Sequence, residues 1–142
     1  MSKIEAGRTN YQNYFMYKQK FSYTEQLIKL NQQIKVLEDV RCADSSFSGK
    51  RKELYLQRGK ILMELKEYQK ALVNFEKAEE CDKNDRLVFL NKAKAYYKLG
   101  NFCQAKTALN KFIEISNAKT QFDSSYHEGL RLERDPNIQN IK

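Results

Sequence analysis

Apolar side chains recur every three or four residues through much of the chain, which is the spacing that predicts helices. One such seam lies within residues 22–41, where large apolar residues alternate at four- and three-residue steps: Tyr23, Leu27, Leu30, Ile34 and Leu37. Three more apolar residues widen the seam: Ile28, Val36 and Val40. Ser22 followed by Glu25 forms a capping box, which predicts that a helix begins there. We interpret the segment as a packing helix, and a seam for helix-to-helix dimerisation is the competing interpretation.

Residues 52–116 are rich in leucine, lysine, glutamate, glutamine and alanine, which are strong helix formers. Turn-forming residues interrupt this segment at 82–85 and at 99–101, and they divide it into pieces of roughly a dozen residues. The whole chain holds one proline and five glycines, and its β-branched residues never form alternating runs. We therefore expect an all-α fold.

The segment 52–85 repeats, in the class of its side chains, as 86–119. A shift of 34 residues places aromatic on aromatic and small on small: Tyr55 on Phe89, Gly59 on Ala93, Tyr68 on Phe102 and Ala71 on Ala105. Only six of the 34 positions are identical, so the similarity lies in residue class and does not indicate recent duplication. A period of this length is typical of arrays of helical hairpins.

This spacing resembles the tetratricopeptide repeat family, in which a large residue, a small one, an aromatic and an Ala-x3-Phe step recur every 34 residues. The first unit carries the pattern at Tyr55, Gly59, Leu62, Tyr68, Ala71, Phe75 and Ala78. The second carries it at Phe89, Ala93, Tyr96, Phe102, Ala105, Leu109 and Phe112. The departures are Arg58 and Lys92 for leucine, Lys83 and Asn117 for proline, and Phe112 for alanine. The resemblance implies an α-solenoid of helical hairpins.

The two repeats, residues 52–119, need neighbours that cover their ends, and the flanking segments are expected to supply them. Residues 22–51 hold the packing helix and a loop at 42–51, and residues 120–133 are expected to form a capping helix. Phe122, Tyr126 and Leu130 recur there at four-residue spacing, with Tyr126 and Leu130 facing inward. Residues 1–21 form an N-terminal arm and residues 134–142 a polar tail.

In the resembled family the first helix of each repeat lines a concave groove for partners. The residues that would face the groove here are Gln57, Lys60, Asn91, Lys94, Tyr97 and Lys98. The chain has a net charge of +8, and residues 86–118 carry six positive side chains against one negative, a net +5. We expect acidic peptides or protein surfaces to bind across the second repeat. The competing interpretation is that Lys94 and Lys98 keep an exposed face soluble.

The N-terminal arm gathers aromatic residues, with six of the chain's seventeen within positions 11–23. We take Tyr11, Tyr14, Phe15 and Tyr17 as a partner-docking arm, because such rings serve as anchors in protein interfaces. They could equally fold back over the next helix. Stacking on nucleic-acid bases, beside Lys18 and Lys20, is the alternative.

Catalytic and metal-binding chemistry finds little support in the sequence. His127 is the only histidine, the cysteines Cys42, Cys81 and Cys103 show no paired spacing, and the five glycines stand alone. We therefore expect no enzyme activity, no metal site and no cofactor. Unpaired cysteines favour a reducing compartment such as the cytoplasm. No apolar stretch approaches the roughly 20 residues that a membrane span needs.

Together these features favour a small, basic, non-catalytic module for protein–protein interaction, acting as a structural or adaptor subunit of a larger assembly. Microtubule surfaces are acidic, so the charge makes a cytoskeletal or ciliary setting attractive. An RNA-binding subunit of a ribonucleoprotein, or a subunit of a mitochondrial complex, is the alternative.

Overall fold

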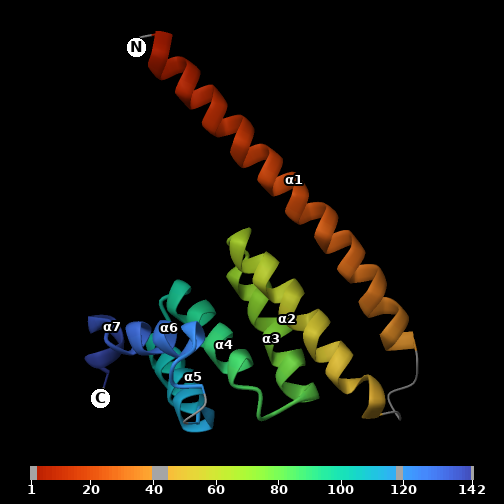
Figure 1. Cartoon of the computed structure of the whole chain (residues 1–142), viewed down its shortest axis with the longest axis vertical. Coiled ribbons are helices and arrows are strands. Elements are labelled where there is room, and N and C mark those ends of the chain that lie inside the picture. The colour runs from red at the N-terminus through yellow and green to blue at the C-terminus, as the bar shows by residue number, and fades with distance from the viewer. Residues whose placement is uncertain (1–2, 40–44, 118–119, 142) are drawn as a thin grey trace.

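The computed structural model describes residues 3–39, 45–117 and 120–141. The elements are α1 (Lys3–Asp39), a 3-10 turn η1 (Ser45–Phe47), α2 (Ser48–Glu64), α3 (Tyr68–Cys81), α4 (Arg86–Lys98), α5 (Phe102–Ile115), α6 (Ser124–Glu133) and α7 (Pro136–Gln139). No strand occurs in the described residues, and the expectation of an all-α fold is confirmed. Helices α2 to α7 gather in one body, and α1 extends well beyond it (Figure 1).

Helices α2 with α3, and α4 with α5, form two hairpins whose turns share one geometry. In each turn an N–H donates to a carbonyl five residues earlier at 2.9 Å: Glu67 to Leu62, and Asn101 to Tyr96. The residue before each donor has a left-handed backbone, with φ of 61° at Lys66 and 76° at Gly100. Because these two turns are 34 residues apart, the sequence repeat is also a structural repeat, and the expected helical-hairpin array is confirmed.

Small residues let the paired helices pack closely. Ala71, Ala93 and Ala105 are completely buried, and a Cβ added at Gly59 would overlap the Phe75 ring. One cluster of buried side chains runs from α1 through α2 and α3 to α4, and a second links α4 and α5 to the C-terminal helices. The core is therefore continuous along the array, as stacking of repeats requires.

Helix α1 is one helix and does not begin at Ser22, so the expected capping box is wrong. Ser22 instead accepts a hydrogen bond from the Gln26 side chain, four residues on, as within a helix interior. The tetrapeptide pattern misleads because residues 3–21 contain no proline and continue as helix through Ser22, so the same pattern lies inside the helix. The division between arm and packing helix therefore falls inside α1.

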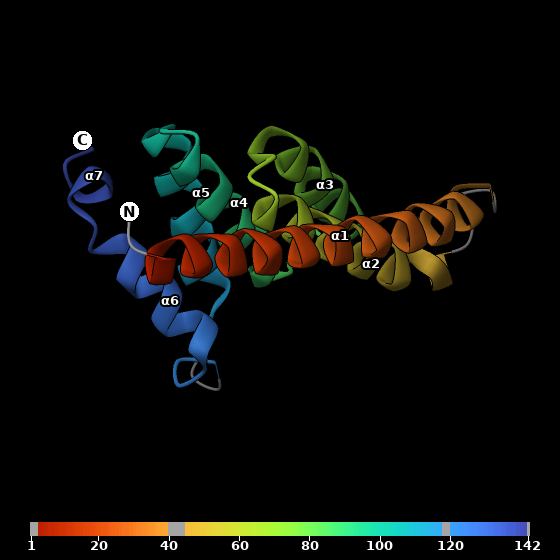
Figure 2. The ribbon, with the colours of Figure 1, turned by 90° about the horizontal axis from the view of Figure 1, so that it is seen from above.

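The seam of α1 packs against α2 through Leu30 and Ile34, which are 6% and 3% exposed. Ile28 and Val36 do not widen it, because they are 54% and 64% exposed on the other side of the helix. Val40 lies outside the described residues. Figures 1 and 2 show α1 running alongside α2 and continuing past its end.

Two expectations for the connecting segments are corrected. The expected loop 42–51 is helical from Ser45 onward, since η1 leads directly into α2; residues 42–44 lie outside the described residues. The expected polar tail contains α7, which Asp135 caps by accepting from the Asn137 N–H at 2.9 Å. Ile138 in α7 is 1% exposed and packs into the second core cluster, so burial of one isoleucine orders this segment.

Helix α6 covers the end of the array through two different contacts. Gly129 lies against the Phe112 ring, which would overlap a Cβ added at this glycine. The Tyr126 ring packs beside the same phenylalanine, with the two ring centroids 6.4 Å apart. Phe122 takes no part, because it precedes the helix and is 86% exposed, which corrects its place in the expected seam.

Candidate partner-binding groove

A groove of about 610 Å³ lies between α1, α2 and α4. It is lined by Tyr23, Lys60, Ile61, Met63, Glu64, Lys66, Tyr68, Asn91, Lys94 and Lys98. We call it the basic groove. Four of the six expected groove residues lie in it, namely Lys60, Asn91, Lys94 and Lys98.

The repeat places these four side chains together. Asn91, Lys94 and Lys98 lie three and four residues apart, so they share one face of α4. Lys60 occupies in α2 the position that Lys94 occupies in α4, and the two helices lie side by side. Asn91 is 7% exposed and donates to the Leu87 carbonyl at 2.7 Å, so it forms part of the floor.

The lysines of the basic groove differ in their pairing. Lys94 forms an ion pair with Glu128 of α6, with Nζ 2.7 Å from the carboxylate oxygen. Lys60, Lys66 and Lys98 enter none of the ion pairs formed by the described residues. Glu64 is the single acid in the lining. The groove therefore keeps a positive potential that its own residues do not neutralise.

Gln57 and Tyr97 lie outside the basic groove. Gln57 lines an adjoining pocket toward α1 and donates to Glu53 at 3.1 Å. The Tyr97 hydroxyl donates to Asp135 at 2.7 Å, and its ring packs edge-on against Phe102 with centroids 5.4 Å apart. Tyr97 therefore holds the C-terminal segment instead of facing a ligand.

The lining also contains residues that the sequence did not place in the groove, including Tyr23, Lys66 and Tyr68. Tyr23 fits the apolar seam of α1, which predicts a core position. In the structure it is partly buried against the first core cluster and also lines the groove on the α1 side. Lys66 has a sequence signal, since the 34-residue shift aligns it with Gly100 in a turn that follows a groove-lining helix. The part played by Tyr68, the first residue of α3, had no such signal.

The expected docking residues lie on the N-terminal half of α1 and are strongly exposed. Tyr11, Tyr14, Phe15 and Tyr17 are 72%, 63%, 61% and 73% exposed. They do not fold back over the seam. Tyr17 lines a shallow pocket of about 430 Å³ where α1 passes the end of α2.

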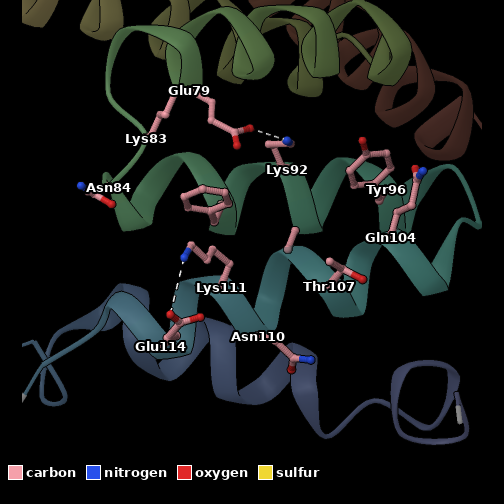
Figure 3. Close-up of a pocket in the computed structure, with 12 residues that line it drawn as sticks. Glu79, Lys83, Asn84, Lys92, Tyr96, Gln104, Thr107, Asn110, Lys111 and Glu114 are labelled. Atoms are coloured by element: carbon pink, nitrogen blue, oxygen red, sulfur yellow. Dashed lines mark hydrogen bonds and ion pairs between the residues drawn. The ribbon is translucent and has the colours of Figure 1, made fainter.

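A second hollow, about 710 Å³ and so larger than the basic groove, lies between α3, α4 and α5 and contains none of the expected site residues. Figure 3 shows two of its lysines paired with acids, Lys92 of α4 with Glu79 of α3, and Lys111 with Glu114 within α5. Lys92 lies 2.5 Å from Glu79, and Lys111 lies 3.5 Å from Glu114. Because acids there balance most of the lysines, this hollow offers less net charge than the basic groove.

Reactive side chains are scattered in the described part of the chain. No group of three or more histidine, cysteine, aspartate or glutamate side chains there could hold a metal ion. Burial raises the pKa of the Cys81 thiol, which disfavours the reactive thiolate. Cys103 and His127 are exposed, and Cys42 lies outside the described residues. None of the described helices is long and apolar enough to cross a membrane.

Comparison with known proteins identifies the repeats. One family model described as "TPR repeat" matches residues 59–100, and one described as "Tetratricopeptide repeat" matches residues 88–119. Tetratricopeptide repeat protein 12 of Mus musculus is 37% identical over 65 residues, which make up 46% of this chain and 9% of that protein. The chain therefore spans only a small part of the length of this relative. With two hairpins of the matching period in the structure, the chain is a tetratricopeptide repeat-containing protein.

Proposed function

We propose that this protein is a non-catalytic interaction module whose basic groove binds an acidic segment of a partner protein. Tetratricopeptide repeats are typically non-catalytic and typically bind proteins, and both matching families are of this kind. The groove narrows the class of partner to one with acidic side chains.

One observation carries the proposal: Lys60, Lys66 and Lys98 converge on a single groove without an ion pair among the described residues. Several other lysines of the body are paired, such as Lys52, whose Nζ lies 3.0 Å from carboxylate oxygens of both Asp82 and Asp85. Like charges brought together in this way repel one another, and an acidic ligand relieves that repulsion.

The groove also offers apolar surface beside its charges. Tyr23 and Tyr68 stand at its sides, and Ile61 and Met63 contribute from α2. Interfaces combine such aromatic and aliphatic contacts with a charged rim. An acidic segment with one or two large apolar residues therefore fits the groove better than a uniformly charged polymer.

The wider setting of this module belongs to the proposal as well. We place it as a structural or adaptor subunit of a larger cytoplasmic assembly. Its +8 charge suits an acidic cytoskeletal or ciliary surface, and this setting is supported by charge alone.

The direct test is the binding of a fluorescent peptide that contains a run of glutamates and one aromatic residue. Reversing Lys60 and Lys98 to glutamate should weaken binding about tenfold or more, a change of about 1.4 kcal/mol. Lys94 is left unchanged, because its reversal would also break the ion pair with Glu128. Raising the salt concentration should weaken binding by the wild type far more than by the variant.

The matched control reverses Lys50 and Lys83, which lie outside the basic groove, enter none of the ion pairs formed by the described residues and change the net charge equally. This control should bind the peptide nearly as tightly as the wild type does, with only a small loss of affinity from the lower net positive charge. Equal losses in both variants would show that net charge and not the groove attracts the peptide.

RNA binding is the competing function, because exposed rings of α1 lie beside Lys18 and Lys20. Capture from a native extract with and without nuclease separates the two. Bound proteins that survive nuclease and are lost with the Lys60→Glu/Lys98→Glu variant support the groove. Bound material that disappears with nuclease and ignores this variant would contradict the proposal.

A further inference from the structure

Helix α1 carries a second stripe, of mostly apolar residues, that is exposed along its length, although Tyr17 at its edge also lines the pocket beside the end of α2. Its members are Tyr14, Tyr17, Phe21, Thr24 and Ile28, and we call it the outer stripe. Phe21 and Ile28 are 58% and 54% exposed. Tyr14, Phe21 and Ile28 are seven residues apart, with Tyr17 and Thr24 between them at the three-residue step. This is the heptad spacing of a coiled-coil seam.

The outer stripe faces away from the repeats. Ile28 lies on it, whereas Leu30 packs against α2 and is 6% exposed. Residues two positions apart in a helix point about 200° apart, so the two apolar faces of α1 are nearly opposite. A second helix can therefore pack on the outer stripe without displacing α2.

The N-terminal part of α1 also lacks support within its own chain. The end of α2, at Glu64 to Lys66, lies beside residues 13–23 of α1, and the helix continues beyond that point (Figure 1). A helix without tertiary packing is marginal in water, because its stability comes mostly from an apolar face that is covered. This segment needs a packing partner in order to remain a helix.

We propose that the outer stripe pairs with the outer stripe of a second copy of this chain, with the two α1 helices antiparallel. In the heptad register Tyr17 then packs beside Ile28 of the second copy, and Phe21 beside Thr24. The flanking Lys18 of each copy lies opposite Glu25 of the other, so two charge pairs of opposite sign form. A two-fold axis relates the copies, and the unsupported part of each α1 lies along the part of the other that α2 supports.

A parallel pair fits the same residues less well. Continuing the seven-residue spacing of Tyr14, Phe21 and Ile28 leads to Lys35. A parallel arrangement would place this lysine against Lys35 of the second copy, within the seam between the two helices. It would also crowd both repeat bodies at one end. The antiparallel arrangement places Lys35 near Asn10 and sets the bodies at opposite ends.

The test is the mass of the full chain in solution, measured by sedimentation over a series of concentrations. The wild type should dimerise, and the Phe21→Ala/Ile28→Ala variant should raise the dissociation constant about tenfold or more. Both residues are exposed in the single chain, so circular dichroism should show an intact repeat body. The matched control Phe15→Ala/Val36→Ala removes one ring and one branched aliphatic side chain that are 61% and 64% exposed and lie off the stripe and its flanks, and it should dimerise as the wild type does.

Charge reversal decides the orientation. Lys18→Glu should weaken the dimer, and the Lys18→Glu/Glu25→Lys double variant should restore it, since only the antiparallel pair faces these two residues. The groove variant Lys60→Glu/Lys98→Glu should dimerise normally, which separates this proposal from the proposed function.

Three results would overturn the proposal. The first is a wild type that stays monomeric at every concentration. The second is a stripe variant and an off-stripe control that weaken the dimer equally. The third is a monomer that binds vesicles of anionic lipid and loses this binding in Phe21→Ala/Ile28→Ala, which would make a lipid surface the occupant of the stripe.

Discussion

Two glycines set the spacing between helices in this protein. Gly59 meets the Phe75 ring within the first hairpin, and Gly129 meets the Phe112 ring where α6 covers α5. At either site even a methyl group would overlap ring atoms of a fully buried phenylalanine. Each glycine thus allows a close approach that no other residue permits.

Replacing Gly59 by alanine should destabilise the protein. Overpacking costs about 1–3 kcal/mol, and the better helix propensity of alanine offsets only about 1 kcal/mol. Gly49→Ala is the matched control, because nothing lies within 4 Å of its added Cβ and it should be neutral or slightly stabilising. Denaturant unfolding of both variants measures the difference, and a Gly59→Ala protein as stable as Gly49→Ala would contradict this account of the packing.

Three of the five departures from the family pattern, Arg58, Lys92 and Phe112, are explained by their contacts. Arg58 donates to Asn74 of α3 at 2.5 Å, and Lys92 pairs with Glu79 of α3 at 2.5 Å. Each replaces an apolar contact by a polar link to the neighbouring helix. The bulk of Phe112 is matched by Gly129, which leaves room for its ring. These compensations join residues distant in sequence, so the repeat pattern alone could not predict them.

At the scale of elements, α1 is joined to α2 by polar contacts as well as by its seam. The Tyr55 hydroxyl donates to Glu38 at 2.6 Å, and Arg58 donates to Asn31 at 2.9 Å. Burial, together with the hydrogen bond to Glu38, raises the pKa of Tyr55 to about 12. The phenol is therefore held neutral in the folded state at pH values where a free phenol ionises.

Tyr55→Phe should cost about 1 kcal/mol at neutral pH, a modest loss because Glu38 is exposed. The raised pKa favours the folded state at every pH below the unfolded value of about 10. That advantage is lost as the pH rises from about 10 toward 12, so the stability difference between wild type and variant should shrink there. Denaturant unfolding across this range measures it, with the tyrosinate absorbance as a second signal. A difference that stays constant with pH would contradict the role given to this hydroxyl.

How far the sequence predicts the elements depends on whether their signal is local. The hairpins of 52–119 follow from a 34-residue repeat that the structure reproduces in its turns. The start of α1 was missed because a capping box inside a helix looks the same as one at its end. The helix α7 was missed because its order comes from Ile138, which is buried by contacts with distant residues.

At the scale of the whole molecule, the array brings groove residues together from four helices and leaves three of the lysines without ion pairs among the described residues. The repeat register was enough to place Lys60, Asn91, Lys94 and Lys98 on one side. It could not show that Glu128 neutralises Lys94, or that Tyr97 turns toward Asp135, because α6 and α7 fall outside the repeat. Contacts with these covering helices decide which of the expected residues stay available to a ligand.

The most direct test of the basic groove follows backbone amide resonances of isotopically labelled protein during titration with the glutamate-rich peptide. The account predicts that shifts concentrate around Tyr23, Lys60 to Glu64, and Asn91 to Lys98, which line the groove from α1, α2 and α4. Shifts concentrated around Lys83 and Lys111, or along Tyr11 to Tyr17, would place the acidic ligand on another surface and contradict the central claim.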